Sequence, residues 1–179
     1  MGLGQTLLTI MALMLMGLLI LNVNRTTLEV GSSKDVSEYR ITATSLGTSL
    51  LEYANALSFD EATVDTFLLA SQSSSLTAAT SFGPETGESN YTLYDDIDDY
   101  HNFSLTDTIE NSAIFTVRAR IDYLNVSTTS ISTTTTKTFN KLITVYVTSP
   151  FMVDYQVDPN TPRPDTLKFQ SVFSYWYFR

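Results

Sequence analysis

Cysteine is absent from the 179-residue sequence. Its absence excludes disulfides and thiolate metal sites, so a secreted fold would depend on packing alone. Histidine occurs once, at His101, which removes most histidine-based metal sites and acid–base pairs. Since His101 has no evident nucleophile partner in the sequence, we expect no enzymatic activity and no catalytic residues.

Basic residues are missing from two long stretches. No ionisable side chain precedes Arg25, and no Lys or Arg lies between Arg40 and Arg118, although that interval is rich in carboxylates. The formal net charge is −9. A chain this acidic would be repelled by phosphate backbones, so nucleic-acid binding is disfavoured.

The N-terminal stretch is apolar on every side. Leu7–Val23 is interrupted only by Thr9, Gly17 and Asn22. At ~1.5 Å per helical residue, residues 1–24 would span a ~30 Å hydrocarbon core. A secretory signal peptide would need a basic segment before the apolar run and a small-residue cleavage site after it, and neither is present. We therefore expect a retained hydrophobic helix.

The pattern continues into an amphipathic helix over residues 25–57. No Pro occurs from Thr26 to Leu57, and apolar residues recur at helical spacing. This stripe consists of Tyr39, Ala43, Leu46, Leu50, Tyr53, Ala54 and Leu57. We predict one helix over about residues 3–57, with Gly17 and Gly31 as candidate kinks.

Two segments carry a family resemblance. Leu46–Glu61 reads LGTSLLEYANALSFDE, and Asp95–Asn102 reads DDIDDYHN. Together with the hydrophobic helix, they resemble type IV pilins and pseudopilins, and the acidic segment is similar to one in minor pilins of the mannose-sensitive haemagglutinin type. The resemblance implies a subunit that waits in the cytoplasmic membrane and then joins copies of itself in an extracellular filament at the cell surface.

Position 5 departs from the family pattern. Most pilins have Glu at the fifth mature residue, where it is thought to pair with a neighbour's N-terminal amine. If Met1 is the mature N-terminus, this chain has Gln5 there instead. An amide can still form a hydrogen bond, and losing a buried carboxylate removes its desolvation cost. The resemblance implies that assembly contacts come from one set of N-terminal residues: Met1, Gln5, Leu8, Met11, Leu15 and Leu18.

Residues 58–179 predict a β-rich domain. Ser112–Tyr123 and Lys137–Thr148 alternate apolar and polar residues, as strands with one buried face do. The polar segment between them predicts a hairpin with a long loop. Phe151–Val157 and Thr166–Phe178 are further candidate strands. The expected fold is α+β, with a long helix packed on an antiparallel sheet of four or five strands.

The C-terminal segment Phe173–Arg179 reads FSYWYFR. As a strand it would have aromatic side chains on both faces, which are too many to leave in water. Two interpretations remain open. The segment is either a central strand with its second face under the helix or a contact with a neighbouring subunit.

The acidic cluster Asp95, Asp96, Asp98 and Asp99 is the one candidate site for a cofactor. Oxygen ligands of this kind suit Ca²⁺. The segment is not an EF-hand loop, because the glycine at the sixth position and the closing Glu are missing. The alternatives are a solvated acidic loop, or aspartates that cap turns and pair with Arg118 or Arg120.

Asn-X-Ser/Thr triplets make four residues candidates for glycosylation: Asn24, Asn90, Asn102 and Asn125. Ser and Thr are dense in Ser71–Thr77 and Ser127–Thr138, as expected of exposed strand faces and loops or of dense O-glycosylation.

The leading functional hypothesis is a structural filament subunit that polymerises through its N-terminal helix. One alternative is a minor pilin or a pseudopilin of a secretion system. Another is a membrane-anchored binding module that never polymerises.

Overall fold

The computed structural model describes residues 2–109, 113–154 and 163–176. The chain divides into two compact units, Met1–Glu38 and Tyr39–Arg179. We describe each by itself and call the second unit, from Tyr39 onward, the head. The expected α+β fold is confirmed, since a long helix precedes an antiparallel five-stranded sheet.

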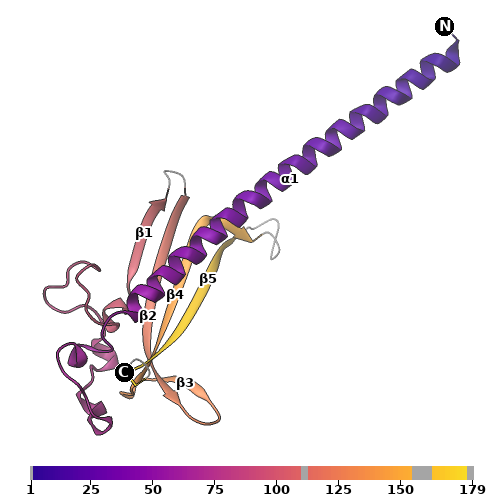
Figure 1. Cartoon of the computed structure of the whole chain (residues 1–179). Coiled ribbons are helices and arrows are strands. Elements are labelled where there is room, and N and C mark those ends of the chain that lie inside the picture. Colours follow the sequence, from indigo (N-terminus) through magenta and orange to yellow (C-terminus); the bar gives the residue numbers. More distant parts are fainter. Residues whose placement is uncertain (1, 110–112, 155–162, 177–179) are drawn as a thin grey trace. The chain divides into compact units, whose positions relative to one another are not determined.

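The helix α1 spans Leu3–Asn55 (Figure 1). It runs through Gly17 and Gly31 without interruption, so the helix is not broken at either candidate kink. Before residue 31, every described side chain of the first unit is exposed. Within the described residues, α1 is the one helix long and apolar enough to cross a membrane, with a mean hydropathy of 2.3 in its most apolar window.

Residues 39–55 of α1 pack against the sheet of the head (Figure 1). Ala43 and Ala54 are fully buried, as the apolar stripe predicts. Gly47 lies against the ring of Phe169, where a larger residue would not fit. Alanine or glycine at positions 43, 47 and 54 therefore allows the helix backbone to approach the sheet closely.

Five strands form the sheet, and every pairing is antiparallel. They are β1 (Ser104–Ile109), β2 (Ala113–Val126), β3 (Ile131–Thr134), β4 (Asn140–Asp154) and β5 (Arg163–Ser174). Their order is β1-β2-β4-β5, and β3 pairs with β2. The predicted antiparallel pairing of β2 with β4 is confirmed, and Ile121 lies opposite Ile143. The link between them is not only a loop, as predicted, because it contains β3.

Two predictions about strands need correction. Residues 151–154 continue β4 past a register shift between Thr148 and Val153, so they are not a separate strand. The rest of that predicted strand lies outside the described residues. Moreover, β5 lies at an edge of the sheet, so the central-strand interpretation of Phe173–Arg179 is wrong.

The described part of that aromatic segment divides between core and surface. Phe173 and Tyr175 are buried, whereas Trp176 is 48% exposed. The N–H of Tyr175 also donates to the carbonyl of Phe139, and its ring stacks on the Phe139 ring. The last three residues lie outside the part of the chain that the structure describes.

Between α1 and β1 the chain forms four short 3₁₀ turns, namely η1 (Glu61–Thr63), η2 (Ala70–Ser75), η3 (Ala79–Ser81) and η4 (Asp98–Tyr100). This region is anchored by buried apolar side chains that join the core of the sheet. They include Phe59, Leu68, Leu76, Ile97 and Tyr100. The acidic segment Asp95–Asp99 is held in place by this packing.

Candidate functional site: an acidic loop around a buried lysine

Lys141 of β4 is fully buried within the head. Its Nζ donates to the carbonyl oxygen of Phe59 at 2.7 Å and to Oδ2 of Asp60 at 2.8 Å, and it also pairs with Oδ1 of Asp98. The rings of Phe59, Phe82 and Tyr123 surround the ammonium, with centroids at 4.6, 5.0 and 5.5 Å. Two ion pairs and three aromatic rings thus replace the water that Lys141 loses on burial.

Asp60 joins this lysine to three other segments. Its Oδ1 accepts from the backbone N–H of Ala62 at 3.2 Å and so caps η1. The N–H of Thr77 lies 3.0 Å from the same oxygen, and the hydroxyl of Tyr123 donates to Oδ2 at 3.2 Å. A fully buried carboxylate is stable here because both of its oxygens have donors.

The acidic segment is folded by its own carboxylates. Oδ1 of Asp96 accepts from the N–H groups of Asp98 and Asp99 at 2.8 and 3.2 Å. In return, Oδ2 of Asp99 accepts from the N–H groups of Asp95 and Asp96 at 3.2 and 3.3 Å. Each of these two buried aspartates therefore uses one oxygen to hold the turn.

The second carboxylate oxygen of Asp96 and of Asp99 takes no part in these hydrogen bonds. Oδ2 of Asp96 and Oδ1 of Asp99 are both buried and have no hydrogen-bond partner. Asp96 and Asp99 belong to two separate groups of three carboxylates, and within each group one oxygen from every residue lies within 4.8 Å of the others. The first group is Glu61, Asp95 and Asp96, and the second is Glu85, Glu88 and Asp99.

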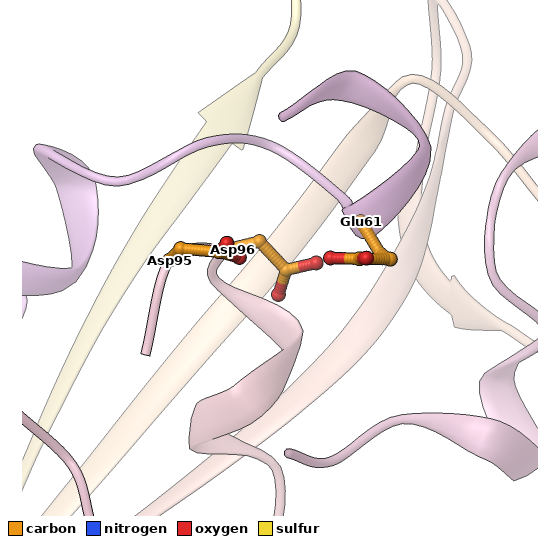
Figure 2. Close-up of side chains that lie close together, drawn as sticks. All are labelled: Glu61, Asp95 and Asp96. Carbon is orange, nitrogen blue, oxygen red and sulfur yellow. The ribbon is translucent and has the colours of Figure 1, made fainter. Parts of the chain in front are cut away.

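Backbone hydrogen bonds join the segment after α1 to the acidic loop. The N–H of Ser58 donates to the carbonyl of Asp95, and the N–H of Ile97 donates to the carbonyl of Ser58, both at 3.0 Å. This bridge lies just before Glu61. Figure 2 shows the Glu61 and Asp96 carboxylates directed towards each other, with Asp95 beside them.

Burial and mutual repulsion raise the carboxyl pKa values in the loop. Burial, and then the charge of Asp98, raises the pKa of Asp96 to about 9, although Lys141 partly opposes this shift. Burial likewise raises the pKa of Asp99 to about 6 and that of Glu85 to about 8. In the absence of a further cation, Asp96 therefore holds a proton at neutral pH.

The predicted metal ligands are brought together only in part. Asp95 and Asp96 share one group and Asp99 belongs to another, whereas Asp98 pairs with Lys141. The alternative of aspartates that cap turns is confirmed for Asp96 and Asp99, which accept from backbone N–H groups of the turn. Pairing with arginine is wrong, because Arg120 pairs with Asp122 and Arg118 is exposed on the sheet.

The sequence interpretation missed Lys141, Glu61, Glu85 and Glu88. One signal for the lysine was present. In the alternating pattern of Lys137–Thr148, Lys141 falls between Phe139 and Ile143 on the face that is otherwise apolar. The three glutamates gave no such signal, because only the tertiary fold brings them to the loop.

Apart from Met1, the predicted assembly residues lie on α1 and are exposed. The exposed fractions of Leu8, Met11, Leu15 and Leu18 are 71%, 60%, 62% and 63%. Gln5 is also exposed, and Met1 lies outside the described residues.

The four candidate glycosylation residues Asn24, Asn90, Asn102 and Asn125 are all exposed, which leaves each of them sterically open to modification. His101 is a packed loop residue. Its Nδ1 lies 2.8 Å from the carbonyl oxygen of Ile121, and its ring contacts that of Phe82.

Comparisons with protein-family models, curated proteins and solved structures find no match to the chain.

Proposed function

We propose that the chain is a structural subunit of an extracellular filament of the type IV pilus kind, which polymerises through residues 1–24. One observation carries the proposal. The helix α1 begins with an uncharged, apolar stretch whose described side chains are all exposed.

These exposed apolar side chains must be shielded from water both while the subunit is in the membrane and after it has joined a filament. Burying one Leu, Ile or Met side chain stabilises by about 1.5–3 kcal/mol, and this stretch offers such side chains on every side of the helix. Lipid covers them while the subunit waits in the membrane. In the filament, the same helices of neighbouring copies pack together and form an apolar core.

The chemistry of the head suits the outer layer of such a filament. The loop around β3 is rich in Ser and Thr and mostly exposed, and the net charge of the chain is −9. Polar, acidic surfaces keep densely packed domains soluble. Glycans on the exposed sequons would add to this layer.

Electron microscopy of material sheared from producing cells tests the proposal. We expect long fibres built from a 19.9 kDa subunit. Leu15→Lys and Leu18→Lys should abolish the fibres while the protein still accumulates in cells, because an unpaired charge in the apolar core is strongly disfavoured. Leu15→Met is the matched control and should give normal fibres.

Two results would count against the proposal. If the wild-type chain stays with the membrane and gives no fibres, it is a membrane-anchored module. If both lysine variants form normal fibres, residues 1–24 are not the filament core.

A further inference from the structure

The carboxylates around the acidic loop outnumber the cations that could neutralise them. Lys141 is already engaged by Asp60, Asp98 and the carbonyl of Phe59. Among the described residues, no lysine or arginine forms an ion pair with Glu61, Asp95 or Asp96. This group of three therefore has no ion-pair partner among the described residues, although the charge of Lys141 acts on Asp96.

Asp96 is the member of the group that points to a ligand. Its side chain is 1% exposed, and its Oδ1 is fixed by two backbone N–H groups. Its Oδ2 is buried without a hydrogen-bond partner. The Asp96 carboxylate also contributes an oxygen to the group in which oxygens of Glu61, Asp95 and Asp96 lie within 4.8 Å of one another. A buried carboxylate oxygen without a hydrogen-bond donor is costly unless a proton or a cation occupies it, and a bound cation would take that place.

The group is also held in position before any ligand arrives. The bridge between Ser58 and Asp96 fixes the two segments against each other. Glu61 opens the turn that Asp60 caps, and Asp60 is tied to buried Lys141. Glu61 and Asp95 are exposed, so two of the three carboxylates are accessible to solvent.

We propose that Glu61, Asp95 and Asp96 bind one Ca²⁺ ion, with water completing its coordination. Carboxylate oxygens are the ligands that hard divalent cations take. Ca²⁺ accepts irregular sets of six to eight oxygens, whereas Mg²⁺ requires near-octahedral geometry and retains its water. The set differs from the sequence prediction, since Glu61 enters it and Asp98 does not. This inference does not depend on whether the chain forms filaments.

Calcium titration of the full-length chain in detergent tests the site. After treatment with a chelator, the melting of the head is followed by the near-ultraviolet circular dichroism of its aromatic residues, and Ca²⁺ binding is measured by calorimetry. We expect a Kd of about 10⁻⁴–10⁻³ M, as in extracellular calcium modules. At 10 mM Ca²⁺ the Tm should rise by about 3–10 °C, and 10 mM Mg²⁺ should give a smaller rise.

Three variants locate the ion. Glu61→Gln changes an exposed side chain and should weaken Ca²⁺ binding at least tenfold without unfolding the head. Asp96→Asn should abolish binding. Asp107→Asn removes the same charge from exposed strand β1 and should leave the affinity unchanged.

The proposal is overturned if neither the Tm nor the calorimetric signal responds to 10 mM Ca²⁺. It is also overturned if Glu61→Gln binds as tightly as the wild type. A loss of binding in Glu88→Gln but not in Glu61→Gln would place the ion in the other carboxylate group and would equally contradict it.

Discussion

Gly47 of α1 and Phe169 of β5 approach so closely that a Cβ atom on residue 47 would overlap Cδ2 and Cε2 of the Phe169 ring. Since Gly47 is buried within a helix, its role is to make room for this ring rather than to provide backbone freedom. The contact fixes the distance between the helix and the sheet within the head.

Gly47→Ala is therefore expected to destabilise the head by about 1–3 kcal/mol through overpacking, although alanine is the better helix former. Gly31→Ala is the matched control, because nothing lies within 4 Å of a Cβ there, and it should stabilise the helix by up to about 1 kcal/mol. Combining Gly47→Ala with Phe169→Leu should recover part of the loss in chemical denaturation. Equal stability of Gly47→Ala and wild type would show that the ring can move aside.

Lys141→Met should destabilise the head by about 3–5 kcal/mol, because Asp60 and Asp98 would remain buried without their cation. The control Lys34→Met removes an exposed lysine from a surface pair with Glu38 and should change stability by less than about 1 kcal/mol. Denaturant unfolding of both variants checks the difference. A loss for Lys141→Met no larger than that of the control would mean that the aspartates find other partners.

The stability of the calcium-free head should fall as the pH rises from about 4 to about 9. Asp96 ionises near its ordinary value in the unfolded chain but only at about 9 in the folded chain, so the folded state holds the extra proton throughout that window. Asp98, Asp99 and Lys141 are the charged groups that act on Asp96, with Glu61 and Asp95 beside it.

Melting curves recorded with a chelator at several pH values measure the slope of the head's stability against pH. Asp96→Asn should reduce it, while Asp99 and Glu85, whose pKa values are also raised, contribute slopes of the same sign. Because Ca²⁺ must displace the proton of Asp96, its stabilising effect should be larger at pH 8.5 than at pH 6. A calcium effect that does not depend on pH would contradict ligation by Asp96.

Gln5 gives a fourth prediction, which rests on the proposed filament. If its amide replaces the usual carboxylate by hydrogen bonding, Gln5→Ala should reduce the fibre yield and Gln5→Glu should be tolerated. Quantifying sheared fibres from both variants checks this. A normal yield for Gln5→Ala would mean that position 5 has no role in assembly.

The sequence predicted the elements that have one buried face. The stripe containing Ala43 and Ala54 and the alternation in β2 and β4 arise because the core covers one side of each element. By contrast, β1 and β3 were missed because their described side chains are mostly exposed, and a strand without a buried face shows no apolar alternation.

The candidate site was predictable only where its residues are neighbours in the sequence. Asp95–Asp99 is visible as a cluster, and the position of Lys141 on an apolar strand face indicated a buried charge. The pairing of that lysine with Asp60 and the approach of Glu61 to Asp96 depend on tertiary contacts that no local pattern encodes.

The sequence separations of the Lys141 ion pairs have a consequence for how the head folds. Lys141 lies 81 residues from Asp60 and 43 residues from Asp98, so neither pair forms until distant parts of the chain have met. Burying either aspartate earlier would leave a charge without its counterion, which makes partly assembled heads unstable. We therefore expect slow folding and a single cooperative unfolding transition in which the loop and the sheet are lost together.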